Sequence, residues 1–457
     1  MDNTLTGDRH APAAEDEPSS RIAALNAVLR KVTWRLMPLI MVCYLFAFFD
    51  RINISFAKFQ LQSALHLSDT AYGLGASLFV LGYVLFELPS NLLLYRVGAR
   101  RWIARIMISW GLATAAMVFV TTDWQFYALR FVVGAMEAGF APGVLYYLTL
   151  WFPQAARGRV TSLLSLASAG AGIFGAPVAG LILGHMDGVG GMPGWHWLFL
   201  LGGLPCLPLG LIVLRRFDDR VDDARWLSDD ERRLLSAQIN VQGPATTQAA
   251  HGGSALWAAL KSPALLMLGL VYFLIQVASY GLNFWAPHLI RSSGVSGSGL
   301  IGLLTAVPYL CGAITMVIVG RWSDANGERS RFVAALLVLA AIGFGFAGYF
   351  DQTPSMLIIA LAVLGCGVVA SIPAFWALPP KLATGVGAAG GIALINTLGQ
   401  LGGIVSPLMV GRIKDLTGST TPALYVIGGA ALVCAALVTW GLPQSLRQRE
   451  GSAEARR

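Results

Sequence analysis

The sequence predicts an all-α membrane protein with twelve transmembrane helices in two pseudo-symmetric six-helix bundles. Three observations support this prediction. The 457 residues are 56% hydrophobic and only 12% charged, whereas soluble domains average about 25% charged residues. The apolar residues gather into twelve windows, each close to the roughly 20 residues that a membrane-crossing helix needs. Most Lys and Arg residues fall in alternate loops.

The apolar windows divide the chain into five segments. These are an N-terminal tail (1–35), a first bundle (36–214), a cytoplasmic linker (215–262), a second bundle (263–441) and a C-terminal tail (442–457). The first bundle holds windows at about 36–57, 72–94, 102–121, 125–148, 160–185 and 195–214. The second holds windows at about 263–287, 299–320, 332–350, 355–376, 387–411 and 422–441.

The linker and the tails are too short for a catalytic or signalling domain. Ser228 followed by Glu231 is a capping-box pattern and predicts a short helix, and the stretch from Gly243 to Gly253 is polar. The chain has no phosphate-binding loop of the Walker type, and its five Cys and six His residues have no metal-ligand spacing. We therefore expect neither an enzyme nor a membrane sensor, and no metal or cofactor.

The positive charges predict the orientation of the chain. Among the predicted outside loops, only four basic residues occur, Lys58, Arg291, Arg412 and Lys414. The remaining loops and both tails hold nearly all the others, which places both termini in the cytoplasm. This is a pattern of a multi-pass protein of the inner (plasma) membrane, not of a nucleic-acid-binding surface.

The two halves repeat each other. Pro177 and Pro407 lie 230 residues apart, and Gly172 and Gly402 keep the same offset. Transporters built from such repeats bind their cargo near mid-membrane, at the interface between the repeats. We expect the functional site there.

Four charged residues interrupt the apolar windows: Asp50, Arg51, Arg130 and Glu137. Each such charge costs about 2.5–3.5 kcal/mol on insertion scales, so these residues are expected to be functional. Asp50 and Arg51 lie about 100° apart on a helix and cannot face the same way. Arg130 and Glu137 lie two turns apart on one face, roughly 10 Å along the axis, and are not expected to pair.

Two structural alternatives stay open for these charges. The first pair could be a buried ion pair that only fixes helix packing, and Arg130 could extend outward to the interface. Weaker candidates for a cavity wall are polar or aromatic residues in several windows, and packing is the alternative for each. They are Tyr44, Tyr83, Gln276, Tyr280, Asn283, Trp376 and Asn396. Glu87 is expected to be a structural partner for loop arginines.

Motifs along the chain resemble the major facilitator superfamily. Its loop signature G-x-x-x-D-R-x-G-R-R corresponds to Asn91 through Arg101, with Arg96, Arg100 and Arg101 in place but the Gly and Asp positions changed. A second copy, Gly320-Arg321-Trp322-Ser323-Asp324, keeps both. The resemblance implies gating loops, in which Asp324 could form the salt bridge that the first loop lacks.

Further motifs resemble the anion:cation symporter branch, which includes tartrate, phthalate, hexuronate and galactonate permeases. They are Phe49-Asp50-Arg51-Ile52-Asn53-Ile54, Phe86-Glu87-Leu88-Pro89-Ser90-Asn91, the run from Arg130 to Gly139, Phe284-Trp285-Ala286-Pro287 and the run from Gly390 to Asn396.

The resemblance implies the major facilitator fold and proton-coupled uptake of a small organic anion by alternating access. The cargo class covers hydroxy acids, sugar acids and aromatic carboxylates. Asp50 and Glu137 would carry protons, and Arg51 and Arg130 would bind or couple the anion. The alternative is a proton-coupled exporter or anion exchanger of the same fold. We expect a monomer in the lipid bilayer, with protons and the anion as its only partners.

Overall fold

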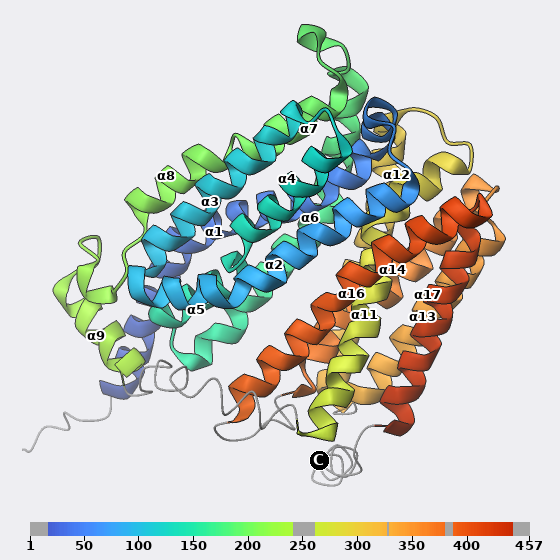
Figure 1. Cartoon of the computed structure of the whole chain (residues 1–457). Helices are drawn as coiled ribbons and strands as arrows, with labels where there is room; N and C mark the ends of the chain where they lie inside the picture. The colour runs from blue at the N-terminus through green and yellow to red at the C-terminus, as the bar shows by residue number, and fades with distance from the viewer. Residues whose placement is uncertain (1–16, 241–260, 327–328, 380–386, 442–457) are drawn as a thin grey trace, which may run out of the picture.

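The computed structural model describes residues 17–240, 261–326, 329–379 and 387–441 (Figure 1). Helices account for the regular structure of these residues. Residues 1–16 of the predicted N-terminal tail (1–35), the predicted C-terminal tail (442–457) and the polar stretch from Gly243 to Gly253 lie outside them. Residues 17–35 of the predicted N-terminal tail form the beginning of a long helix, Glu17–Leu65. The prediction of an all-α fold is confirmed for the described part of the chain.

The first half runs from α1 to the short helix α9. Its α-helices are α1 (Glu17–Leu65), α2 (Asp69–Val97), α3 (Ala99–Ala115), α4 (Asp123–Glu137), α5 (Phe140–Trp151), α6 (Gln154–His185), α7 (Gly194–Gly203), α8 (Cys206–Arg216) and α9 (Asp229–Asn240). Short 3₁₀ turns are η1 (Ala116–Phe119), η2 (Val189–Gly191) and η3 (Val221–Asp223).

In the described residues after the linker, the second half contains six α-helices. They are α11 (Pro263–Ser292), α12 (Ser298–Asn326), α13 (Arg329–Tyr349), α14 (Pro354–Trp376), α16 (Gly387–Thr417) and α17 (Thr421–Ala436), which continues as a π-helical turn, η5 (Leu437–Gly441).

Eleven helices in the described residues are long and apolar enough to cross a membrane, and a shorter apolar stretch, Ala169–His185, lies within α6. Together they account for the twelve spans that the sequence predicts. Two of these spans are built from two helices each, because the backbone departs from a straight helix between α4 and α5 and between α7 and α8. Such interruptions are common in transporter helices, where they line a cavity.

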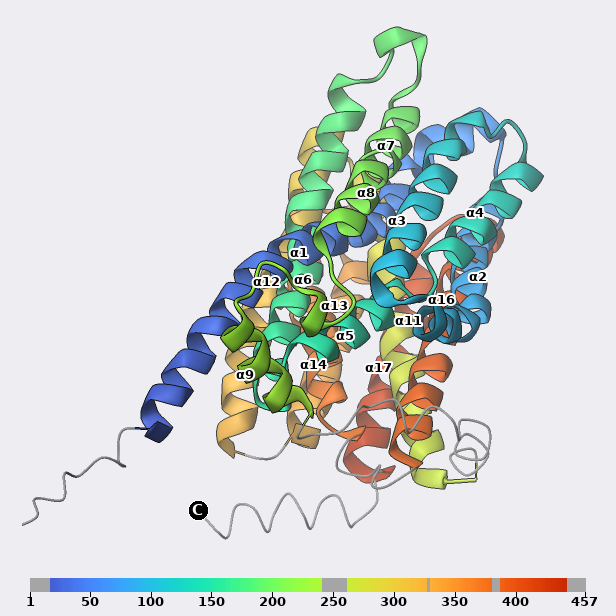
Figure 2. The same cartoon turned by 90° about the vertical axis from the view of Figure 1, so that its left-hand side faces the viewer.

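The two halves lie side by side, with α2 against α16, α6 against α12 and α1 against α11 (Figures 1 and 2). We call the end of the bundle that carries α9 the linker end, and the opposite end, where Leu65 connects to Asp69, the far end. The linker end is the predicted cytoplasmic side.

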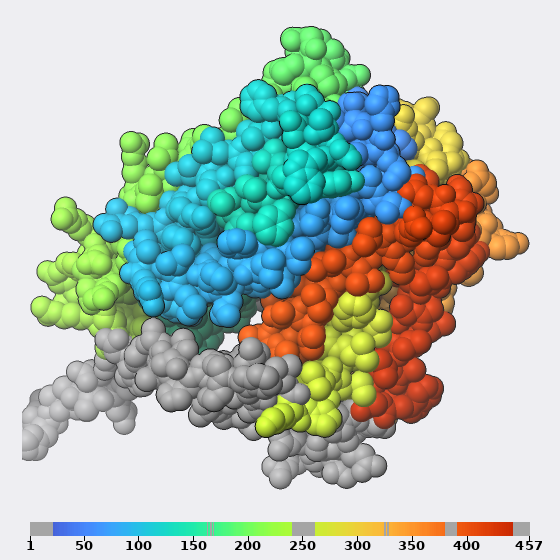
Figure 3. Space-filling model, viewed as in Figure 1, coloured from blue at the N-terminus to red at the C-terminus, as the bar shows by residue number. Residues whose placement is uncertain are grey.

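Near the far end the halves pack backbone against backbone. A Cβ atom at Gly73 of α2 would collide with the carbonyl of Pro407 in α16, and one at Gly302 of α12 would lie 2.6 Å from the carbonyl oxygen of Ala176 in α6. Small residues permit such close helix contacts. In the space-filling view the halves are in contact at the upper right, and a gap opens between them at the lower edge (Figure 3).

The beginning of the linker packs on the first half. The capping box predicted at Ser228 is present: its amide donates to the Glu231 carboxylate at 2.8 Å, and the Glu231 amide donates back to its hydroxyl at 3.2 Å. Glu231 also pairs with Lys31 of α1 at 2.7 Å. Trp226 stacks on Trp151 with ring centres 5.6 Å apart. These contacts fix α9 beside the linker end of the first half.

Candidate functional site

An ion pair joins α1 and α4 in the middle of the first half. Arg51 donates through Nε and Nη2 to Oε1 of Glu137, at 2.9 and 2.6 Å. Arg51 keeps 24% of its side chain exposed, whereas Glu137 keeps 1%. The other carboxylate oxygen, Oε2, is buried and has no hydrogen-bond partner in the described part of the protein. The guanidinium is therefore the accessible member of the pair, and the acid is the enclosed one.

Glu137 is the last residue of α4 because the backbone turns directly after it. Gly139 has a φ of +86°, in the left-handed region that favours glycine. A Cβ there would collide with the Ser90 hydroxyl, which donates to the Ala138 carbonyl at 2.7 Å. The window 125–148 predicted one continuous span, and this prediction is corrected to two helices with the acid at their junction.

Asp50 and Arg130 are a second set of buried opposite charges, but Nε and Nη2 of Arg130 have no hydrogen-bond partner in the described part of the protein. Asp50 accepts a hydrogen bond from Trp110 Nε1 of α3 at 3.2 Å, and both charged residues are 1% exposed. They interact electrostatically with each other. The guanidinium carbon of Arg130 lies 4.7 Å from the ring centre of Phe79, so Arg130 does not extend outward to the interface. Asp50 and Arg51 face different neighbours, as their separation on the helix predicts.

The second half contributes neutral polar groups opposite Arg51. Arg51 interacts electrostatically with Tyr280 of α11 and with Tyr83 of α2, whose ring centre lies 5.1 Å from its guanidinium carbon. The Oε1 atom of Gln400 accepts hydrogen bonds from Gln276 at 3.2 Å and from the Tyr280 hydroxyl at 3.4 Å. The site is thus shared between the halves, as the repeat predicts.

One hydrogen bond between the halves involves Glu87. Asn396 of α16 donates to its carboxylate at 3.4 Å. The sequence predicted arginine partners from the loops for Glu87, and the bond that the structure places there comes from an amide instead. Trp376 lies edge-on to Tyr272 at 5.0 Å between ring centres and belongs to an aromatic cluster of the second half. Its packing accounts for its position.

Two other predicted residues have local partners. Asn283 accepts a hydrogen bond from the Tyr309 hydroxyl at 2.6 Å, across α11 and α12. Tyr44 is 7% exposed, and its hydroxyl donates to the carbonyl of Ala141 at 3.4 Å, beside the junction of α4 and α5. Tyr44 therefore supports the backbone turn that places Glu137.

The predicted gating loops lie at the linker end. Arg96 and Arg101 are exposed, and the backbone amide of Arg100 donates to Asp219 Oδ1 at 2.9 Å, so the linker caps the start of α3. The side chain of Asp324 lies outside the described residues. The role of these four residues in gating stays a prediction.

A cluster of charges that the sequence did not predict closes the far end. Asp69 forms two ion pairs: its Oδ1 lies 2.7 Å from Lys58 Nζ, and its Oδ2 lies 3.0 Å from Lys414 Nζ of α16. Lys414 Nζ also lies 2.9 Å from His288 Nε2. Lys58 is 0% exposed and lies 3.5 Å from the ring centre of Trp285. We call these five residues the far-end cluster.

Asp415 extends the far-end cluster by capping α2. Its carboxylate accepts from the backbone amides of Asp69 and Thr70 at 3.0 and 2.7 Å, a favourable position for an anion. Lys58 was expected in an outside loop, which is wrong because α1 continues to Leu65 and buries it. Lys58 lies seven residues after Arg51, on the same helix face, and this spacing in the sequence could have indicated that Lys58 is buried.

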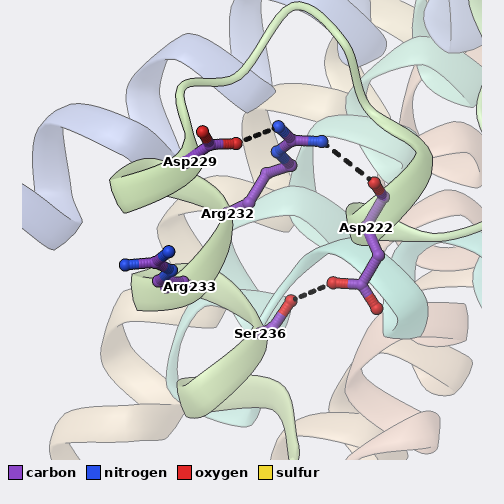
Figure 4. A pocket seen from close by; sticks show the side chains of 5 residues that line it. All are labelled: Asp222, Asp229, Arg232, Arg233 and Ser236. Atoms are coloured by element: carbon purple, nitrogen blue, oxygen red, sulfur yellow. Dashed lines mark hydrogen bonds and ion pairs between the residues drawn. The ribbon is translucent and has the colours of Figure 1, made fainter.

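An open pocket in the linker is separate from this site (Figure 4). Arg232 pairs with Asp229 and donates to the Asp222 carbonyl at 3.2 Å, and the Ser236 hydroxyl donates to the Asp222 carboxylate at 3.0 Å. Arg233 points away from this network in Figure 4. Arg232 and Ser236 thus bond to acidic residues of the same segment, and these bonds stabilise α9 and the turn before it.

Two bundles of membrane-crossing helices, with a buried ion pair in the first and neutral polar side chains facing it from the second, define a membrane transporter, not an enzyme. The family model of the Major Facilitator Superfamily matches residues 40–407 and 298–457, and the chain belongs to this family.

Relatives of similar length support this assignment. The chain is 41% identical to "Putative metabolite transport protein NicT" of Pseudomonas putida, over 93% of this chain and 96% of the relative. It is 42% identical to a "Putative tartrate transporter" of Agrobacterium vitis, over 90% of each chain. Among solved structures, the inward open conformation of the xylose transporter XylE from E. coli aligns with a TM-score of 0.70 and 14% identity, covering 90% of this chain and 96% of that one. This last likeness shows the fold alone.

Proposed function

We propose that this protein is a proton-coupled symporter that imports a small organic anion across the inner membrane, with both termini in the cytoplasm. The observation that carries the proposal is the Arg51–Glu137 ion pair, in which a partly exposed cation covers a buried acid. A cargo carboxylate can replace the acid on the guanidinium, because the two groups have the same charge and bind the same donors.

The exchange of carboxylates explains the coupling to protons. Once the cargo binds Arg51, Glu137 remains in a nearly dry site without its counter-charge, where the ionised form is unfavourable. Glu137 then takes up a proton, so the site binds the anion without a change in its net charge. A binding event can shift the equilibrium between outward and inward states only through such a difference in interaction energy. Asp50 and Arg130 compensate each other behind the site.

The orientation of the chain gives the direction of access. The far-end cluster closes the predicted outside, while Arg51 remains partly exposed. On this proposal, Arg51 is reached from the linker end, the predicted cytoplasmic side. The relative named for tartrate favours an organic acid as the cargo. An acid of this class would be released to the cytoplasm from the state described here.

Transport by purified protein in proteoliposomes tests the proposal. An imposed proton gradient should drive accumulation of organic acids, and Glu137→Gln should abolish this accumulation while leaving exchange of labelled for unlabelled cargo. Glu87→Gln is the matched control, since it removes a second acid near the chamber, and it should keep proton-driven uptake. Arg51→Ala should remove anion binding altogether.

Three results would contradict the proposal. Proton-driven uptake by Glu137→Gln would remove the acid from the coupling mechanism. Unchanged anion affinity in Arg51→Ala would remove the binding role of the guanidinium. Accumulation only when the proton gradient is reversed would identify an exporter.

A further inference from the structure

The charges around the central chamber come from one half of the protein. Asp50, Arg51, Arg130 and Glu137 all belong to the first half. In the second half, six stretches contain no Asp, Glu, Lys, Arg or His; they are residues 263–287, 292–320, 332–350, 352–380, 382–411 and 416–441. These stretches include nearly all of the membrane-crossing length of that half. The wall that faces Arg51 from the second half is therefore built without fixed charge.

Only one cation of the chamber is available to a cargo. Arg51 keeps 24% of its side chain exposed, whereas Arg130 is 1% exposed and has Asp50 as its opposite charge. The ring of Phe79 contacts both guanidinium groups and has Arg130 over it at 4.7 Å. A guanidinium pairs with one carboxylate through two charge-assisted hydrogen bonds, so Arg51 can bind one carboxylate of a cargo.

The opposite wall offers hydrogen bonds of both kinds. Gln276 and Tyr280 converge on Oε1 of Gln400, and a neighbouring bond joins Tyr309 to Asn283. Amides and phenols donate and accept hydrogen bonds, so they fit hydroxyl groups, ring nitrogens or aromatic faces. These neutral amides and phenols do not compensate the full negative charge of a carboxylate. The acids close to Arg51 are Glu87 and Glu137, and neither can form an ion pair with a second carboxylate.

We infer that the cargo carries a single ionised carboxylate on a neutral, polar or aromatic body, and that a second ionised carboxylate is selected against. This inference rests on the proposed function, because it assigns the carboxylate to Arg51. An unpaired carboxylate in a partly dry site loses its hydration without gaining a partner, so a diacid should bind at least about tenfold more weakly than the matched monoacid. Because tartrate has two carboxylates, a preference for monoacids would distinguish this protein from a tartrate carrier.

Matched acids provide the test. Binding to the purified full-length protein would be measured by calorimetry and thermal shift at pH 7.5, for gluconate against glucarate and for monomethyl phthalate against phthalate. Each pair shares its carbon skeleton and differs in one ionised carboxylate. The monoacid of a pair should bind at least about tenfold more tightly. Equal or tighter binding of the diacids would overturn the inference while leaving the proposed function intact, provided that Arg51→Ala abolishes their binding.

The opposite wall allows a gain-of-function test as well. Gln400→Arg would place a cation across the chamber from Arg51 and should improve the binding of diacids relative to monoacids. Gln400→Met, which keeps the side-chain length without charge, is the control. In this variant the affinity for the diacid should stay below the affinity for the matched monoacid. A panel in which no acid binds to the wild-type protein would overturn both the inference and the proposed function, so the two failures remain distinguishable.

Discussion

The far-end cluster makes a quantitative prediction about the conformational equilibrium. Asp69 forms ion pairs with both Lys58 of its own half and Lys414 of the other half. Asp69→Asn keeps the shape of the side chain and removes its charge. In the closed far end, Lys58 would then be completely buried beside a second cation, while an opened far end would let water reach it.

The size of the effect follows from the burial of these residues. Removing one partner of a buried ion pair costs about 3–5 kcal/mol, and because Asp69 keeps 16% exposure we take the lower value of about 3 kcal/mol. This cost applies to the closed state alone, so the equilibrium should move about a hundredfold towards an open far end.

A reporter cysteine measures this shift. Val410 of α16 is 1% exposed next to the far-end packing, and Val410→Cys in a variant without the five native cysteines can be labelled with a membrane-impermeant maleimide. Asp69→Asn should raise the labelling rate strongly. Asp351→Asn is the matched control, because Asp351 accepts a bond from Thr421 within the second half and should leave labelling unchanged. Equal labelling rates in both variants would refute the reasoning.

Two further predictions concern the turn after α4 and the docking of α9. Gly139→Ala should destabilise the protein by about 1–3 kcal/mol and reduce transport, whereas Gly429→Ala, at a helical site with nothing within 4 Å, should be neutral in thermal melting. The hydrogen bond from Lys31 holds the pKa of Glu231 below its ordinary value. Since the folded-state pKa is the lower one, this contribution is present above the unfolded pKa of about 4.3 and is lost as pH falls. Protease sensitivity of the linker should therefore rise on acidification in wild type and already be raised at neutral pH in Glu231→Gln; no difference between this variant and Asp230→Asn would contradict the assignment.

The fold could be predicted from composition, because apolar length and the cost of unsatisfied backbone in lipid leave few alternatives. The position of Lys58 could not. A hydropathy window treats any lysine as the end of a span, and the first window accordingly stops at about residue 57. In the structure α1 continues to Leu65, since Asp69 neutralises the lysine and Trp285 covers it. The partner that permits burial comes from the next helix, which a local window does not include.

The residues of the site could be named from the sequence, but not their pairing. Charges in apolar windows identify Arg51, Arg130 and Glu137, and helix periodicity excludes a direct bond between the latter two. The partner of Glu137 depends on how α4 crosses α1. The place of α4 relative to α1 depends on the packing of α4 against α2, which is tight at Gly134, where a Cβ would collide with the backbone of Phe79 in α2. Contacts of this kind are properties of the packed bundle. The roles of these residues in transport remain predictions.

The division of charge between the halves limits how cargo can affect the far end. On the proposed mechanism, exchange of carboxylates at Arg51 alters charge within the first half only, and the second half responds through hydrogen bonds and shape. One set of contacts that joins the halves lies along α2 and α16, where Gly73 packs on Pro407 and Asp69 pairs with Lys414. Because α2 also carries Tyr83 beside Arg51, one rigid helix touches both the cargo site and the far-end cluster. A cargo that moves α2 at its middle must therefore alter the Asp69–Lys414 contact at its end, which is the physical link that alternating access requires.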